Sequence, residues 1–195
     1  REATVKGVRF HEHGGPDVLR YEDLPDPEPG EGEALIKLSA VGVNFIDTYR
    51  RAGAYPVPLP CLPGSEGAGE VVALGPGPSP VAVGDRVMGL LSGGGYAERV
   101  VTHSRLALKV PDSLSWDEAG ATPEVYITAH DALRQCGLVA GETVLIHAAG
   151  SGVGVAAIQI AKAMGASLVI GTAGSDEKIE KAKALGMDVG ANYKT

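Results

Sequence analysis

The sequence predicts a mixed fold, in which an all-β, barrel-like domain is followed by half of a doubly wound α/β domain. Up to about residue 110, short segments of alternating polar and apolar residues are separated by Gly and Pro. Near residue 115 the spacing of apolar residues changes to that of a helix. After Gly141 the chain reads as strand, glycine turn, helix, strand, helix and the start of a third strand. We therefore expect one domain over residues 1–118 and a second over residues 119–195.

The first domain is expected to consist of short strands joined by proline-rich loops. Ala34–Leu38 and Gly69–Leu74 have the composition of strands. Asp23–Pro29 and Tyr55–Pro63 are predicted to be loops, because proline fixes φ and cannot donate a hydrogen bond to a sheet. Ser115 is placed to cap a helix that follows it.

The second domain is expected to be a βαβαβ unit. Its predicted strands and helices are Thr143–His147, Gly152–Met164, Ser167–Gly171, Asp176–Leu185 and a last strand from Asp188. Such a unit is the half of a doubly wound sheet that binds one mononucleotide. Because a complete sheet of this type has about six strands, we expect the chain to be a C-terminally truncated form, with an unpaired edge on its first strand.

Composition restricts the class of partner. The formal net charge is -7, and no run of Lys or Arg is present, which argues against binding to nucleic acid or to anionic membranes. The two cysteines are not in CxxC spacing, which excludes a disulfide scaffold and a Cys-rich structural zinc site. No stretch has the length and hydropathy of a membrane span. We expect a cytoplasmic protein with a small-molecule partner, without a nucleic-acid or membrane partner.

The turn Ala148–Gly154 carries the strongest signal for a ligand. It joins a buried strand to a helix through small residues, which allow the backbone and the positive end of the helix dipole to approach a pyrophosphate. The strict G-x-G-x-x-G pattern is not met, and the alternative is a tight connection that binds nothing. The residues predicted to bind the dinucleotide here are Ala149, Ser151, Gly152, Val153 and Gly154.

The end of the next strand indicates which dinucleotide is bound. Sites for NAD usually place Asp or Glu at this point, but the segment Gly171–Ser175 contains no acid. The absence of an acid suits the 2′-phosphate of NADP, because a carboxylate would repel that phosphate. We therefore predict NADPH as cofactor. Asp176 and Glu177 argue against this unless they only complement the dipole of the following helix. The alternative to a phosphate contact for Lys178 is a solvated surface lysine that binds no ligand. The predicted contacts are Gly174, Ser175, Lys178 and Tyr193.

Four segments occur in the order seen in a known superfamily. They are Gly42–Tyr49, Pro63–Val71, Val83–Val87 and Ala148–Gly154. Together they resemble the medium-chain dehydrogenases/reductases, and within them the zinc-independent quinone oxidoreductase group, including the p53-inducible and zeta-crystallin-like types. The resemblance implies a GroES-like β-barrel domain followed by the first βαβαβ half of a Rossmann domain. It also implies a homodimer.

The same resemblance implies that no metal is bound. In the zinc alcohol dehydrogenases of this superfamily, a Cys takes the position of Asn44 and a His takes that of Ser65. A catalytic zinc needs about three protein ligands, and Asn44, Ser65 and Glu66 are a poor set. Hydride acceptance without a Lewis acid favours electron-poor acceptors such as quinones or conjugated enones.

Roles for residues outside the glycine turn also come from the resemblance. It places Asn44 beside the nicotinamide and the substrate, Tyr49 and Tyr55 in the substrate cleft, and Thr128 near the nicotinamide. We predict Asn44, Tyr49 and Tyr55 as catalytic residues, and Asn44 and Thr128 as cofactor contacts. The alternatives are a turn residue for Asn44, core or rim positions for the tyrosines, and a bond from Thr128 to its own helix backbone.

The predicted function is NADPH-dependent reduction of quinones by hydride transfer without a metal. One alternative is an enoyl or enone reductase, which needs a proton donor for the α-carbon, either Tyr49 or a water molecule. A second is a dinucleotide-binding protein without turnover, as in lens crystallins. We expect the truncated chain to have little activity.

Overall fold

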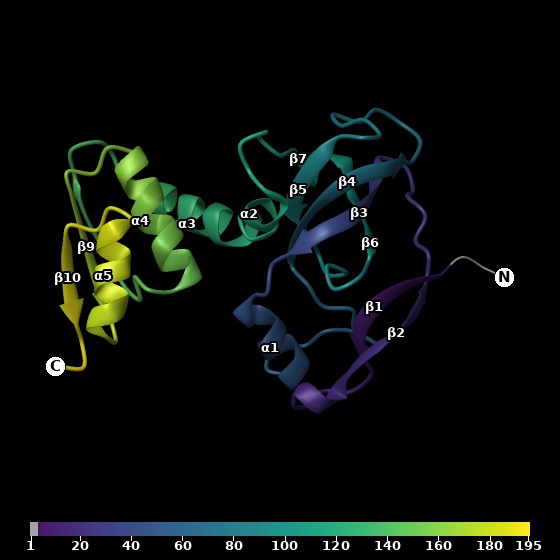
Figure 1. Cartoon of the computed structure of the whole chain (residues 1–195), viewed down its shortest axis with the longest axis horizontal. Helices are drawn as coiled ribbons and strands as arrows, with labels where there is room; N and C mark the ends of the chain where they lie inside the picture. The colour runs from purple at the N-terminus through teal and green to yellow at the C-terminus, as the bar shows by residue number, and fades with distance from the viewer. Residues whose placement is uncertain (1–3) are drawn as a thin grey trace. The chain divides into compact units, whose positions relative to one another are not determined.

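The computed structural model describes residues 4–195, which form two compact units that divide between Glu124 and Val125 (Figure 1). Unit 1 ends at Glu124, and unit 2 runs from Val125 to Thr195. Helix α3 (Pro123–Gln135) begins in unit 1 and continues in unit 2. Among the helices of residues 4–195, none is both long and apolar enough to cross a membrane.

Unit 1 is built on antiparallel sheets, which confirms the predicted β domain. Strands β1 (Thr4–Phe10) and β2 (Leu19–Pro25) form one pair. The larger sheet has the order β6-β3-β4-β5-β7. Its strands, in chain order, are β3 (Glu33–Val41), β4 (Glu66–Leu74), β5 (Arg86–Leu90), β6 (Arg99–His103) and β7 (Leu108–Lys109). Their alternating apolar side chains, including Ile36, Val71 and Val87, form a buried core, because successive residues of a strand point to opposite faces.

Two features of unit 1 differ from the sequence-based expectation. The segment after β3 is a helix, α1 (Phe45–Ala52), where only strands and loops were expected. The residues that favour this helix are local in sequence. Asp47 is in the first turn, Arg50 and Arg51 are in the last turn, and Gly53 ends the helix in the left-handed region at φ 81°. The start of the expected loop, Asp23–Pro25, instead completes β2, with Pro25 at the end of the strand.

The helical spacing expected from about residue 115 corresponds to two helices. Helix α2 (Trp116–Gly120) begins after Ser115, whose side chain accepts a hydrogen bond from the backbone N–H of Glu118, as the sequence predicted. Helix α3 then starts at Pro123. Proline has no N–H to continue a preceding helix but fits the first turn of a new one, so the break falls there.

Unit 2 is a parallel three-stranded sheet with the order β10-β9-β8, which confirms the βαβαβ prediction. Its elements are β8 (Thr143–Ile146), α4 (Gly152–Ala163), β9 (Leu168–Ala173), α5 (Asp176–Ala184) and β10 (Val189–Asn192). Their apolar side chains, among them Ile158, Val169 and Ile179, form the core of this unit. Ligands of open parallel sheets bind outside the carboxyl ends of the strands, where β8 and β9 lead into α4 and α5.

Candidate cofactor and substrate sites

The turn between β8 and α4 brings the helix N-terminus close to the carboxyl end of the strand. Ala148 has a left-handed backbone, at φ 51°, and Ser151 caps α4 by accepting a hydrogen bond from the N–H of Gly154 at 3.0 Å. A Cβ on Gly154 would lie 2.4 Å from the carbonyl oxygen of Ala148, so only glycine allows this close packing. The remaining free N–H groups of the first helical turn are suited to hold an anion.

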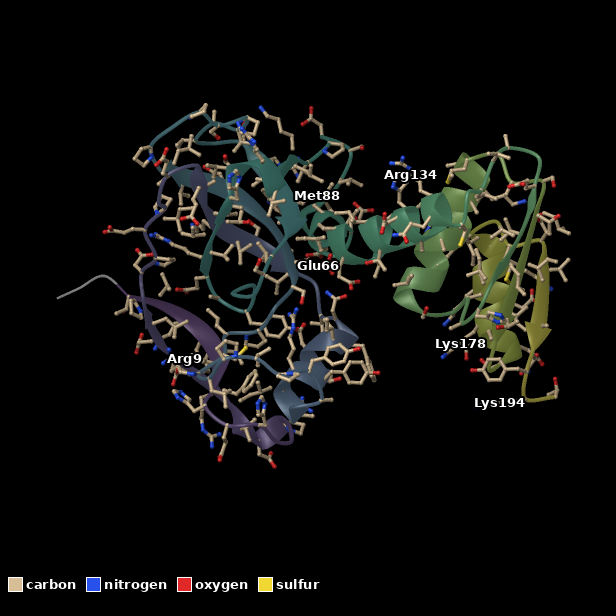
Figure 2. The ribbon with its side chains drawn as sticks, turned by 180° about the vertical axis from the view of Figure 1, so that it is seen from behind. Arg9, Glu66, Met88, Arg134, Lys178 and Lys194 are labelled. Carbon is tan, nitrogen blue, oxygen red and sulfur yellow. The ribbon has the colours of Figure 1, made fainter. Side chains whose placement is uncertain are left out.

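A small pocket of about 90 Å³ opens beside this turn. Four of the predicted cofactor contacts line it together, and its lining residues are Ala148, Gly150, Ser151, Ala173, Gly174, Lys178 and Tyr193. The aliphatic stem of Lys178, labelled in Figure 2, lies over Gly150, where an added Cβ would come within 2.9 Å of it. The ammonium of Lys178 and the hydroxyl of Tyr193 are hydrogen-bond donors of the kind that bind phosphate.

Ser175 and the two acids after it serve the start of helix α5. The hydroxyl of Ser175 accepts a hydrogen bond from the N–H of Lys178 at 3.4 Å. Asp176 accepts from the amide of Asn192 at 2.8 Å, and Glu177 pairs with Lys181 at 2.7 Å. Both acids are in the first turn, where they complement the helix dipole. None of these three residues lines the pocket.

The other predicted cofactor residues of unit 2 have different surroundings. Ala149 and Gly154 are buried, Val153 packs against the core, and Gly152 begins α4 at the surface. These four residues shape the turn but do not line the pocket. Thr128 is exposed on α3 and is not brought to this pocket.

Helix α1 in unit 1 carries an exposed row of aromatic rings. Phe45, Tyr49 and Tyr55 are 73%, 42% and 52% exposed, respectively. The ring centroids of Phe45 and Tyr49 are 5.2 Å apart, and those of Tyr49 and Tyr55 are 5.3 Å apart. The N–H of Tyr55 donates to the carbonyl of Tyr49 at 3.2 Å, which folds the chain after α1 back onto the helix. The structure thus brings together the two tyrosines predicted to contact substrate.

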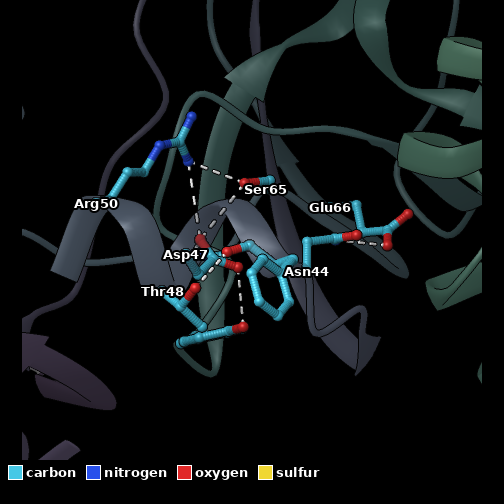
Figure 3. Close-up of polar contacts among 9 residues, drawn as sticks. Asn44, Asp47, Thr48, Arg50, Ser65 and Glu66 are labelled. Atoms are coloured by element: carbon cyan, nitrogen blue, oxygen red, sulfur yellow. Dashed lines mark hydrogen bonds and ion pairs between the residues drawn. The ribbon is translucent and has the colours of Figure 1, made fainter. Parts of the chain in front are cut away.

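Asn44, at the N-cap of α1, is held by a buried carboxylate. Its Nδ2 donates to Oε1 of Glu66 at 2.8 Å (Figure 3). Oε2 of Glu66 accepts from the backbone N–H of Glu124 at 2.8 Å. Glu66 is 2% exposed. Burial, followed by the charge of Glu66, raises the pKa of the Glu124 side chain. Asn44 therefore bonds to β4 directly, and Glu66 in turn accepts from the first turn of α3.

A second polar cluster surrounds Asp47, which is also buried (Figure 3). Its carboxylate accepts hydrogen bonds from the N–H of Gly64 at 3.2 Å and from the hydroxyl of Tyr96 at 3.0 Å. Arg50 donates to the hydroxyl of Ser65 at 2.9 Å and lies 3.8 Å from Asp47. Burial and the charge of Asp47 raise the pKa of Tyr96, which keeps this phenol protonated.

These contacts do not fit a zinc ion at the positions that the superfamily uses for it. The amide nitrogen of Asn44 faces Glu66 and has no lone pair to offer a metal. The hydroxyl of Ser65 receives the guanidinium of Arg50, which would repel a second cation. Across residues 4–195, no group of three or more His, Cys, Asp or Glu is placed to hold a metal.

Sequence reasoning did not identify three residues of these clusters. Glu66 was considered only as a weak metal ligand, and Arg50 and Tyr96 were not considered. Glu66 had a readable signal, because it is a lone acid within a run of small residues that forms a buried strand. Arg50 also had a local signal, because Asp47 lies three residues before it on the same helix. Tyr96 had none, since Asp47 is 49 positions away from it.

Comparison with known proteins agrees with this architecture. Residues 30–112 match the family model for the alcohol dehydrogenase GroES-like domain, and residues 152–195 match that for zinc-binding dehydrogenase. A quinone oxidoreductase of Pseudomonas aeruginosa is 44% identical over 187 residues, which cover 93% of this chain and 57% of that protein. The chain belongs to the medium-chain dehydrogenase/reductase superfamily.

Two further proteins are similar to the chain in different ways. The Escherichia coli quinone oxidoreductase, whose structure is complexed with NADPH, superposes with a TM-score of 0.90 at 37% identity, over 97% of this chain and 59% of that one. Polyketide synthase GfsB of Streptomyces halstedii is 45% identical over 159 residues, or 81% of this chain and 3% of that protein. The chain thus spans little more than half the length of the quinone oxidoreductases it matches.

Proposed function

We propose that the chain forms the cofactor-binding and acceptor-binding parts of an NADPH-dependent reductase that reduces quinones without a metal. The observation that carries this proposal is the pocket at the ends of β8 and β9. It gathers Lys178 and Tyr193 beside the N-terminus of α4, and no carboxylate lines it. The similarity to quinone oxidoreductases, one of them in complex with NADPH, supports it.

The residues of unit 2 fit a phosphorylated dinucleotide. The turn from Ala149 to Gly154 would hold the pyrophosphate on free backbone N–H groups. Lys178 and Tyr193 would bind the 2′-phosphate, with Gly174 and Ser175 beside it. When bound, NADPH supplies a hydride. The chain itself supplies donors that neutralise phosphate charge, and it presents no acid in the pocket that would repel that charge.

The residues of unit 1 fit a planar acceptor. Aromatic rings stack favourably on one another, and Tyr49 and Tyr55 offer exposed ring surface next to each other. Asn44 would contact the acceptor and the nicotinamide, while Thr128 would contribute to the nicotinamide site. Because the metal positions do not fit zinc, the acceptor must stabilise its own reduced oxyanion, as a quinone does.

Reduction of a conjugated enone or enoyl group is the second candidate. The similarity to the polyketide synthase GfsB supports it. This reaction requires a proton at the α-carbon, which Tyr49 or a water molecule would supply.

We also propose that the protein is a homodimer of the cytoplasm. Support for the compartment comes from Cys61 and Cys136, which are both free thiols. The homodimer is what the resemblance to the quinone oxidoreductase group implies.

Loss of NADPH absorbance separates the candidate functions. The purified protein is assayed with a benzoquinone, with an enoyl thioester, and with neither. Slow oxidation of NADPH by the quinone, above the rate with neither acceptor, is the expected result for this chain. Oxidation with the thioester alone would favour the second candidate, and tight NADPH binding without turnover on either acceptor would indicate a binding protein.

A further inference from the structure

Glu66 is a buried charge with an unusual pair of partners. Buried carboxylates are rare unless they are paired, because desolvation strongly disfavours the charge. Both oxygens of Glu66 accept an N–H group, one from the side chain of Asn44 and one from the backbone of Glu124, each at 2.8 Å. This arrangement suits an ionised carboxylate, which can only accept hydrogen bonds.

The Glu66 carboxylate occupies space that is free only because residue 42, two positions before Asn44, is a glycine. A Cβ on Gly42 would lie 1.9 Å from Oε1 of Glu66, so no larger residue can occupy position 42 with this carboxylate in place. The carboxylate thus lies against the backbone of Gly42 and is held by a hydrogen bond on each oxygen. A group held in this way can dictate the orientation of its neighbour.

We propose that Glu66 is a positioning residue that makes Asn44 present its carbonyl oxygen to the hydroxyl of the reduced acceptor. The two ends of an asparagine amide have nearly the same shape, and only their hydrogen-bond partners decide the orientation. Because Glu66 accepts, the NH₂ group of Asn44 must face it (Figure 3). The oxygen Oδ1 then points away, and among residues 4–195 it accepts no hydrogen bond.

This orientation implies a preference among ligands. A free carbonyl oxygen binds a hydroxyl group and cannot bind an ether oxygen. The site should therefore favour the hydroxyl of a reduced acceptor over its methylated form. The inference rests on the proposed function, because it assumes that Asn44 contacts the acceptor.

The test compares hydroquinone with 1,4-dimethoxybenzene as probes. Binding is followed by NMR titration of the wild-type protein and of Glu66→Gln. The glutamine keeps the size of the side chain and can still accept from the N–H of Glu124, but its NH₂ then faces Asn44. Asn44 should turn over and present NH₂, which donates to either probe. We expect the preference for hydroquinone over its ether to fall about fivefold, as for one net hydrogen bond.

A second change at Asn44 distinguishes positioning from a structural role. In Asn44→Asp with Glu66→Gln, the new carboxylate accepts from Gln at 66 and again presents an oxygen, so the preference should return. Glu70→Gln, an exposed position on the same strand, is the matched control and should retain the wild-type ratio. An unchanged ratio in Glu66→Gln, or no recovery in the double variant, would overturn the proposal.

The side-chain amide resonances of Asn44 provide a readout that needs no ligand. One proton should show the downfield shift of a bond to a carboxylate in the wild type, and this shift should disappear in Glu66→Gln. An identical resonance in both proteins would overturn the positioning role. If the wild type bound neither probe, the proposed acceptor site would be wrong, while the resonance would still decide whether Glu66 orients Asn44.

Discussion

Ala148 and Lys178 show how far the candidate cofactor pocket depends on single residues. Ala148 has a left-handed backbone at φ 51°, a conformation that costs an L-residue about 1–2 kcal/mol. Such strain is typical of functional turns, and here it directs the chain into the N-terminus of α4. Lys178 is an exposed lysine whose stem lies over Gly150, beside the same turn. Its ammonium is the positive charge that we assign to the 2′-phosphate.

Replacement of Lys178 by alanine should weaken NADPH binding and leave NADH binding nearly unchanged. A hydrogen bond to a charged group contributes about 1.5–3 kcal/mol, so the Kd for NADPH should rise about tenfold or more. Calorimetric titration with the two dinucleotides measures both values. Lys183→Ala, on the same helix and paired at the surface with Glu180, is the control and should change neither. Equal effects of Lys178→Ala on both cofactors would contradict the assigned role.

Helix α2 illustrates an element whose stability comes from its own sequence. Ser115 accepts from the N–H of Glu118, and the Glu118 carboxylate accepts from the N–H of Ser115 at 2.9 Å. These reciprocal bonds satisfy donors that a helix end leaves free. They also lower the pKa of Glu118.

Ser115→Ala should therefore reduce the free energy of unfolding by about 1 kcal/mol, the usual value for loss of a cap. Urea unfolding followed by circular dichroism measures the change. Ser113→Ala, in the preceding turn and also exposed, is the matched control and should have little effect. A loss of the same size in both variants would show that the cap is not the cause.

Strand β8 is an edge strand that carries one exposed apolar side chain. Within residues 4–195 it pairs only with β9, and Leu145 on it is 55% exposed. Unpaired backbone groups beside apolar side chains are a template for association with a second chain. We expect the 195-residue chain to associate with itself through this edge.

Leu145→Lys should weaken that association, because edge lysines oppose strand pairing. Analytical ultracentrifugation over a range of concentrations should show a lower association constant for this variant. Leu185→Lys, at the C-cap of α5 and 40% exposed, tests whether any added lysine has the same effect. A wild-type chain that stays monomeric at every concentration would refute the edge as an interface.

On the scale of unit 1 as a whole, Tyr96 joins parts of the chain that are distant in sequence. It precedes β6, and its hydroxyl donates to Asp47 on α1, which also accepts from the N–H of Gly64 before β4. Burial and the charge of Asp47 raise the pKa of Tyr96 above its ordinary value of 10.0. The folded protein thus keeps a proton that the unfolded chain loses at alkaline pH.

The sign of the resulting pH dependence follows from proton binding. Above about pH 10 the unfolded state binds fewer protons than the folded state, so the stability contributed by Tyr96 is complete below that pH and declines above it. Tyr96→Phe should be less stable than wild type at pH 8, with a difference that shrinks towards pH 11. Urea unfolding at several pH values measures this, with Tyr21→Phe as a control for an exposed phenol. A difference that is constant with pH would contradict the prediction.

The sequence by itself determined the parts of this protein that depend on neighbouring residues. The alternation in β3 and β4, the cap at Ser115 and the order of elements in unit 2 were all predictable, and the strand expected at Thr143–His147 ends only one residue earlier in the structure. The pocket residues Ser151, Gly174, Lys178 and Tyr193 were also predictable, because parallel strands place their carboxyl ends at one edge. Helix α1 had local signals too, but the strand-like pattern around it outweighed them.

Only the tertiary structure decided which polar groups meet in unit 1. Asn44 and Glu66 are 22 positions apart, and Asp47 and Tyr96 are 49 apart. No periodicity links such positions, since their contact depends on how β3, β4 and α1 pack. The orientation of the Asn44 amide depends in turn on a carboxylate that is charged and buried at once. Burial makes that contact strong and specific, and burial is a property of the packed chain rather than of any local stretch of its sequence.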